Sequence, residues 1–185
     1  MLDDVIADAN QRMDGAMEAL QRELAAIRTG RASPALVERL MVDYYGTPTP
    51  LNQLAGISAP EPRLLVIQPW DRSSMQAIER SIMESDLGLT PNNDGVVIRL
   101  SIPHLTEERR HELVRLVRAK VEDAKVAVRN VRRDSLESCK ELLNEKLISE
   151  DEERRAQAII QELTDKHVER ADELGKHKEA EILEI

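Results

Sequence analysis

The chemistry that this chain could perform is concentrated in a basic stretch from Arg109 to Arg133. The stretch contains nine Lys or Arg residues and three acidic residues, in a protein of 185 residues whose formal net charge is -9 at pH 7. Without it the chain has 17 basic and 32 acidic residues and would repel polyanions. Guanidinium groups donate paired hydrogen bonds to phosphate oxygens. This segregation of charge indicates one localised contact with a nucleic acid.

Helical geometry places most of these cations on one side of a helix. At roughly 100° per residue, six of them fall within an arc of about 100°, namely Arg115, Arg118, Lys125, Arg129, Arg132 and Arg133. A separate apolar stripe consists of Leu113, Val117, Val121, Ala124, Val128 and Val131. Glu122 interrupts the basic arc, and charged residues opposite an apolar stripe are often only a solvated face. The preference for Arg over Lys favours the nucleic-acid interpretation, because planar guanidinium groups suit phosphates and stacked bases.

The rest of the sequence lacks the motifs of an enzyme. There is no glycine-rich phosphate loop of the Walker type, so we expect the chain not to hydrolyse nucleotides by itself. The four histidines lack metal-ligand spacing to one another or to Cys139, the only cysteine. Serines occur without a nucleophile elbow. We therefore expect no catalytic residues, no metal, no cofactor and no small-molecule substrate.

The composition limits the classes of protein to which this chain can belong. The length suits one or two domains with a real core. Trp70, Tyr44 and Tyr45 are the only aromatic residues, and we expect them to pack a small domain rather than bind a partner. The single cysteine fits a reducing compartment. No apolar run is long enough to span a membrane, and the acidic Asp3 and Asp4 argue against a signal peptide. The sequence predicts a soluble cytoplasmic protein without membrane contact.

Three long helical patterns are present. The first runs from Leu2 to Ile27, with apolar residues in alternating steps of three and four. The second starts after Thr106, a candidate N-cap, and continues to about Leu147 without Gly or Pro. The third starts at Ser149, which has capping-box spacing to Glu152. Its predicted apolar stripe is Ile159, Leu163, Ala171, Leu174 and Ile182.

The composition changes between the first and second helical patterns. All eight prolines and five of the seven glycines lie between Gly30 and Leu105. Strands are predicted at Leu36–Tyr45, Leu64–Gln68 and Val96–Ile102. Ser73 or Ser74 could cap a short helix that contains Met75, Ile78 and Ile82 and ends before Gly88. The sequence predicts a small α+β domain, 30–105, inserted into a discontinuous helical bundle made of 1–29 and 106–185.

Both connections to the inserted domain are short. One consists of Thr29, Gly30 and Arg31, and the other of Ser101, Ile102, Pro103, His104 and Leu105. Gly30 alone could simply terminate a helix, and Pro103 alone could terminate a strand. Because both lie where the chain crosses between domains, we expect a hinge there.

Four segments resemble the ribosome recycling factor family. They are Ile27–Pro34 (IRTGRASP), Tyr44–Leu51 (YYGTPTPL), Leu105–Arg110 (LTEERR) and Val126–Asp134 (VAVRNVRRD). The match covers nearly the whole chain in order and weakens beyond about Thr164. The resemblance implies a mainly α fold: an elongated three-helix bundle plus an inserted β/α/β domain, set like an L.

The resemblance also implies a function. Members of this family act after peptide release: together with elongation factor G and GTP they disassemble the post-termination ribosome so that its subunits are recycled. The implied partners are the ribosome, through its large-subunit ribosomal RNA, and elongation factor G. By the same resemblance, Arg110, Arg129, Arg132 and Arg133 contact that RNA, and we add Arg28 to this set. The chain is expected to be a monomer.

Two other classes of protein stay open. One is a structural coiled-coil protein that oligomerises through its aliphatic stripes, and its stability would rise with concentration. The other is an RNA-binding chaperone that works without the ribosome and binds unrelated RNA with comparable affinity.

Overall fold

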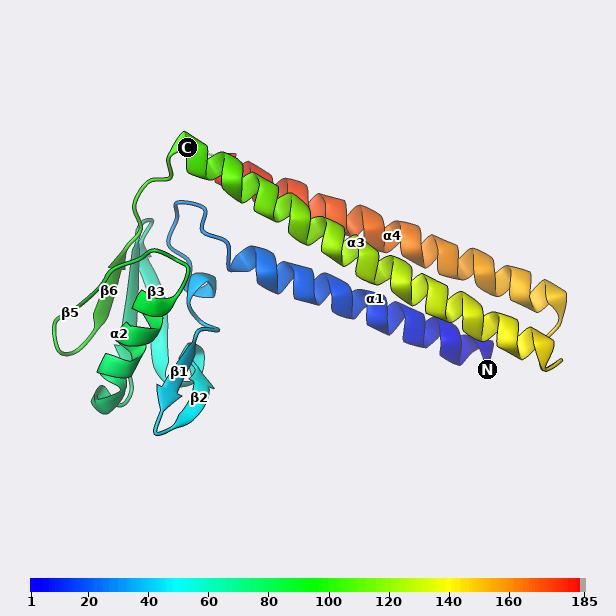
Figure 1. Ribbon diagram of the computed structural model, residues 1–185, viewed down its shortest axis with the longest axis horizontal. Coiled ribbons are helices and arrows are strands. Elements are labelled where there is room, and N and C mark those ends of the chain that lie inside the picture. Colours follow the sequence, from blue (N-terminus) through cyan, green and yellow to red (C-terminus); the bar gives the residue numbers. More distant parts are fainter. Residues whose placement is uncertain (184–185) are drawn as a thin grey trace. The chain divides into compact units, whose positions relative to one another are not determined.

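The computed structural model describes residues 1–183 and divides the chain into two compact units (Figure 1). One unit, the helical unit, combines Met1–Leu24 with the chain from His111 onward. The other, the small unit, is Ala25–Arg110, which extends further at both ends than the predicted 30–105. The predicted class, mainly α with a small α+β domain, is confirmed.

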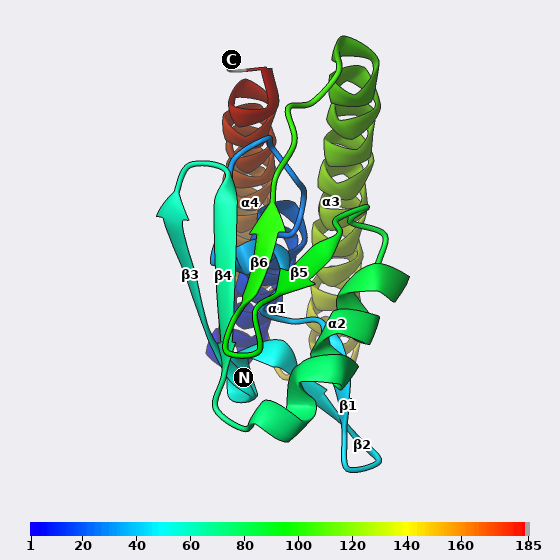
Figure 2. The same ribbon diagram turned by 90° about the vertical axis from the view of Figure 1, so that its left-hand side faces the viewer.

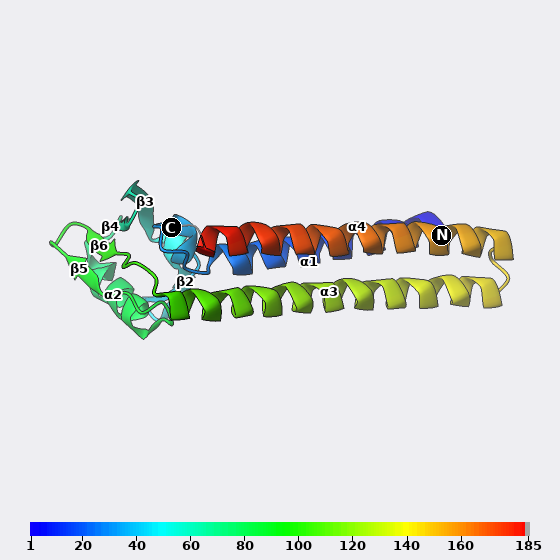
Figure 3. The same ribbon diagram turned by 90° about the horizontal axis from the view of Figure 1, so that it is seen from above.

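The helical unit consists of α1 (Leu2–Ala25), most of α3 (Glu107–Asn144) and α4 (Glu150–Leu183). The three helices run side by side in Figures 1 and 3. α1 buries Ala9, Met13, Met17, Leu20 and Leu24, a spacing of three and four residues that follows the helical period. The six residues of the predicted stripe on α3 are all buried, and so is Cys139.

Local hydrogen bonds fix the ends of the two longer helices. Thr106 caps α3, because its Oγ1 accepts a bond of 3.1 Å from the backbone N–H of Arg109. α3 ends at Asn144 rather than near Leu147, because Lys146 takes a left-handed φ of 61°. The backbone N–H groups of Lys146 and Leu147 then donate to the carbonyls of Leu143 and Leu142, the pattern of a Schellman motif.

The start of α4 confirms the predicted capping box. The N–H of Glu152 donates to Ser149 Oγ at 3.1 Å, and the N–H of Ser149 donates to Glu152 Oε2 at 3.4 Å. The predicted stripe of α4 is wrong at Ile159, which is 41% exposed, and the buried row contains Ile160 instead. Of the other predicted residues, Ala171 and Ile182 are buried, and Leu163 and Leu174 are half-buried. Polar Thr164 and His167 continue this row, which hydrophobic patterning could not recognise.

The small unit contains two antiparallel sheets. β1 (Met41–Tyr44) and β2 (Thr47–Pro50) form a hairpin. β3 (Ala55–Glu61), β4 (Leu64–Pro69), β5 (Pro91–Asn93) and β6 (Ile98–Ser101) form a sheet in the order β3-β4-β6-β5, with β3 and β5 at its edges (Figure 2). α2 (Met75–Glu84) contacts β1 and β5.

Strand prediction succeeded in the middle of the larger sheet. The predicted Leu64–Gln68 and Val96–Ile102 correspond to β4 and β6, whereas the predicted Leu36–Tyr45 is a strand only from Met41. A 3₁₀ turn at Pro34–Leu36 occupies its expected start. β2, β3 and β5 contain prolines and were not predicted. They lie in a two-stranded hairpin or at a sheet edge, where a missing N–H is tolerated.

The short helix is capped differently from the prediction. Ser74 precedes α2 without a capping bond from its side chain, and a 3₁₀ turn, Arg72–Ser74, comes first. Asp71 caps that turn, since its Oδ1 accepts bonds from the backbone N–H and the hydroxyl of Ser73 at 3.0 and 2.7 Å. Met75, Ile78 and Ile82 lie in this helix as predicted, and all three are buried.

Two of the three aromatic residues are exposed, which contradicts their predicted packing role. Tyr44 does pack against the core and donates from its hydroxyl to Asp71 Oδ2 at 3.0 Å. Tyr45 is 78% exposed and Trp70 is 69% exposed. Tyr45 and Gly46 form the hairpin turn with φ values of 51° and 80°. The Tyr45 ring meets Tyr44 edge-on, with centroids 4.6 Å apart, and its hydroxyl bonds to Ser73 Oγ at 3.0 Å, but most of the ring stays exposed.

Candidate nucleic-acid interface

The basic arc of α3 is divided by its neighbours. On one side, Arg118 Nε pairs with Glu179 Oε1 of α4 at 2.8 Å, and Lys125 pairs with Asp172 of α4. These two cations are therefore already balanced by carboxylates of the adjacent helix. We call the other four residues of the arc, Arg115, Arg129, Arg132 and Arg133, its outer face; none of them forms an ion pair with the described residues of α4.

Arg129 and Arg132 differ in how they are held. Arg129 Nη1 pairs with Glu122 Oε1 on the same helix at 3.2 Å, and both side chains are about half exposed. Such a surface pair contributes about 0–1 kcal/mol and can be exchanged for a phosphate contact. Arg132 is half-buried, and its Nε is buried without a hydrogen-bond partner among the described residues. A buried donor of this kind is expected to have an acceptor in the functional complex.

The remaining two predicted RNA-binding residues, Arg28 and Arg110, belong to the small unit. Arg28 Nη2 donates to the carbonyl of Pro103 at 2.9 Å. Burial, and after it the positive charge of Arg109, lowers the pKa of Arg28. The Nε atoms of Arg28 and Arg110 are both buried and have no partner within residues 1–183. Burial and a nearby positive charge both disfavour a charged guanidinium group, and a bound anion would reduce this free-energy cost.

The predicted hinge residues also lie within the small unit. Thr29, Gly30 and Arg31 follow α1, and Ser101 to Leu105 connect β6 to α3. Gly30 has a φ of 85°, which favours glycine, and lies beside Leu105. The bond to Pro103 joins Arg28, the residue directly before the first segment, to the second segment.

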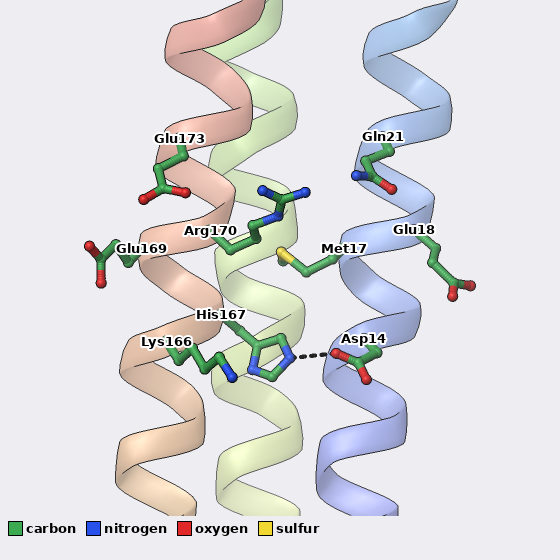
Figure 4. Close-up of a pocket in the computed structure, with 9 residues that line it drawn as sticks. All are labelled: Asp14, Met17, Glu18, Gln21, Lys166, His167, Glu169, Arg170 and Glu173. Atoms are coloured by element: carbon green, nitrogen blue, oxygen red, sulfur yellow. Dashed lines mark hydrogen bonds and ion pairs between the residues drawn. The ribbon is translucent and has the colours of Figure 1, made fainter.

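The opposite charge dominates the other two helices of the helical unit. α1 carries six acidic and two basic residues, and α4 carries eleven acidic and six basic residues. A groove of about 540 Å³ lies between them. Four acidic residues line it, Asp14, Glu18, Glu169 and Glu173, against two basic ones, Lys166 and Arg170 (Figure 4). This side of the unit would repel phosphates, which leaves the outer face of α3 as the candidate interface.

His167 occupies the floor of this groove (Figure 4). Its side chain is buried, its Nδ1 donates to the carbonyl of Leu163 at 2.7 Å, and its Nε2 pairs with Asp14 Oδ1 of α1 at 2.8 Å. The described residues that line the groove include no Ser, Thr or Cys that this pair could activate. His167 lies three residues after Thr164 and four before Ala171, and this helical spacing was the feature of the sequence that could have placed it on the buried side of α4. We interpret the pair as a link between α1 and α4.

Residues 1–183 contain neither a cluster of metal-ligating side chains nor a membrane-spanning helix. No group of three or more His, Cys, Asp or Glu side chains is arranged to hold a metal ion in this part of the chain. None of the described helices is both long and apolar enough to cross a membrane.

Comparison with known proteins decides the family. The family model described as ribosome recycling factor matches residues 20–183. The chain belongs to the ribosome recycling factor family. Among curated relatives, it is 58% identical to the ribosome-recycling factor of Thermomicrobium roseum, 60% to that of a Roseiflexus species and 57% to that of Carboxydothermus hydrogenoformans. Each alignment covers all of both chains.

Solved structures of ribosome recycling factors are also similar to this chain. A solution structure of the ribosome recycling factor matches with a TM-score of 0.78 and 47% identity, over 100% of this chain and 98% of the other. A second match has a TM-score of 0.68 and 49% identity and covers 99% of both chains. It comes from models of the T. thermophilus ribosome recycling factor and E. coli elongation factor G bound to the E. coli post-termination complex.

Proposed function

We propose that this chain acts with elongation factor G and GTP to split the post-termination ribosome into reusable subunits. Membership of the ribosome recycling factor family supports this role. So does its similarity to a factor that was described together with elongation factor G on a post-termination complex. The chain would act in the cytoplasm as a monomer, not as an enzyme, and would use no cofactor or small-molecule substrate of its own.

The observation that carries the RNA-binding part of the proposal is the charge of α3. Its outer face carries Arg129, Arg132 and Arg133, of which Arg129 has only an exposed pair with Glu122 on the same helix, whereas Arg118 and Lys125 pair with carboxylates of α4. We assign these three arginines to large-subunit ribosomal RNA. Arg110 and Arg28 join them as RNA-binding residues of the small unit. Phosphate contacts of this kind supply most of the affinity in nucleic-acid complexes and weaken with salt.

The small unit is proposed to be the part on which the partner acts. Thr29 to Arg31 and Ser101 to Leu105 form the proposed hinge through which its motion reaches the helical unit. The chain has no phosphate-binding glycine loop, so the energy for the movement would come from GTP hydrolysis by elongation factor G.

Sucrose-gradient sedimentation of post-termination ribosomes tests the proposal. Free subunits should form when this chain, elongation factor G and GTP are all present, and should not form when any one is omitted. Ribosomes that stay intact with the complete mixture would contradict the proposal. Sedimentation velocity of the chain alone should give one monomeric species at all concentrations, whereas a coiled-coil scaffold would assemble as concentration rises.

A further inference from the structure

The turn between β3 and β4 contacts both segments that connect the small unit to the helices. Directly after the first segment, Thr29–Arg31, the backbone N–H of Ala32 donates to the carbonyl of Pro62 at 2.6 Å. In the second, the backbone N–H of Ile102 donates to the carbonyl of Arg63 at 2.8 Å. Pro62 and Arg63 are adjacent in the chain, so one tight turn holds both segments.

The side chain of Arg63 adds two further bonds to the second segment. Its Nε donates to the carbonyl of Ile102 at 3.0 Å, and its Nη1 contacts Nε2 of His104. Ile102 is 1% exposed and belongs to the core of the small unit, so the Arg63 bonds surround a residue that cannot move without disturbing that core. A guanidinium group suits this role, because its donors are held in a rigid plane.

We propose that Arg63 is a positioning residue that fastens the Ser101–Leu105 segment to the small sheet. The inference rests on the proposed function, in which a partner moves the small unit and the movement must reach the helices. A flexible connection would bend and would not transmit such a movement to the helices. The Arg63 bonds attach the second segment to the β3–β4 turn, and the Pro62 bond attaches Ala32, directly after the first segment, to the same turn. The bond from Arg28, directly before the first segment, to Pro103 links the two connections to each other.

The test uses the full chain with Arg63→Ala, Arg63→Lys and a matched control, Arg99→Ala. Arg99 lies on β6 of the same sheet and pairs with Asp94 at 2.7 Å, so its loss removes a guanidinium group without removing a bond to either connecting segment. Hydrogen exchange of the Ile102 amide in the free protein should be about tenfold faster or more in Arg63→Ala, because the segment opens locally. Arg99→Ala should exchange at the unsubstituted rate.

The functional measurements separate binding from splitting. Arg63→Ala should bind post-termination ribosomes with unchanged affinity, yet split them at least about fivefold more slowly with elongation factor G and GTP. Arg63→Lys keeps the charge but cannot form the planar pair of bonds, so its rate should lie in between. Arg99→Ala should split ribosomes normally.

Other results would overturn the inference. Unchanged exchange at Ile102 in Arg63→Ala would show that the side chain fastens nothing, whatever the splitting rate. Normal splitting by Arg63→Ala, weaker ribosome binding, or an equal defect in Arg99→Ala would each contradict a positioning role. Failure of the unsubstituted chain to split ribosomes would instead contradict the proposed function, and the exchange result would still decide whether Arg63 fastens the segment.

Discussion

Gly175 of α4 lies so close to Val121 of α3 that a β-carbon built on Gly175 would be 2.6 Å from Val121 Cγ2. Val121 is buried and β-branched, so its side chain has little rotamer freedom on a helix. The two helices can approach this closely only because position 175 has no side chain. The same stretch holds the ion pairs that Arg118 and Lys125 form with α4, so the close approach also shapes the charge of the candidate interface.

Gly175→Ala should destabilise the helical unit. Alanine favours a helix over glycine by up to about 1 kcal/mol, but overpacking a core costs about 1–3 kcal/mol. Because the new β-carbon would be only 2.6 Å from Val121 Cγ2, we expect the overpacking cost to exceed the gain in helix propensity. Gly15→Ala is the matched control: it lies inside α1, and its β-carbon would meet no described atom within 4 Å. Urea denaturation followed by circular dichroism should show a loss for Gly175→Ala and a gain for Gly15→Ala. If both variants were more stable than the unsubstituted chain, α3 and α4 would be able to move apart at little cost.

Arg132→Ala should weaken ribosome binding by about tenfold or more, since charge-assisted bonds contribute about 1.5–3 kcal/mol. Helical content should stay intact, because Arg132 is only half-buried and is not part of the buried apolar stripe of α3. Arg118→Ala, which removes a cation already paired with Glu179, should have a clearly smaller effect. Filter binding at several salt concentrations measures both. Equal losses would show that total charge, rather than the outer face, determines affinity.

His167→Ala should destabilise the helical unit by about 2–4 kcal/mol, because it leaves a cavity and removes the bond that joins α4 to Asp14 of α1. His177→Ala is the control, since that side chain is 79% exposed and its ion pair is with Glu181, one turn away on the same helix. Thermal unfolding of both variants measures the difference. Similar melting temperatures for the two would argue against a linking role for His167.

Acid should weaken the small unit through Asp94. Its Oδ1 accepts backbone bonds from Val97 and Val96, and with Arg99 these hold the pKa of the carboxyl well below its usual range. A lowered folded-state pKa means that the carboxylate stabilises the fold above its unfolded pKa of about 3.9 and loses this effect as the pH falls further. Asp94→Asn should therefore be less stable than the unsubstituted chain at pH 7, and this difference should shrink below about pH 4.

Trp70 provides the measurement for Asp94, because it is the only tryptophan and lies in the small unit. Urea unfolding followed by its fluorescence at a series of pH values gives the stability of both proteins. A difference that stays constant from neutral to strongly acidic pH would show that the Asp94 charge is not responsible.

Several features could be predicted from the sequence because they depend on residues that are close together along the chain. The stripe of α3, its Thr106 cap and the Ser149–Glu152 capping box all follow from the helical period and from bonds that span three residues. The family was also readable, since its signature segments are local.

Other features depend on which parts of the chain meet. The helical wheel put Arg118 and Lys125 in the basic arc, but only the packing of α4 against α3 brings carboxylates to them. The edge strands β3 and β5 form because they pair with β4 and β6. Both contain proline, which is unfavourable in most strands, so their local sequence did not predict them.

The sequence by itself determined three helices, a charged face, a proline-rich insertion and a family. Only the tertiary structure decided that Trp70 and Tyr45 are exposed, that His167 joins two helices and that Arg63 reaches Ile102 and His104. Each of these contacts joins residues far apart in the chain or depends on the surface that other elements leave uncovered. Periodicity and spacing carry no information about such partners, because they describe one segment at a time.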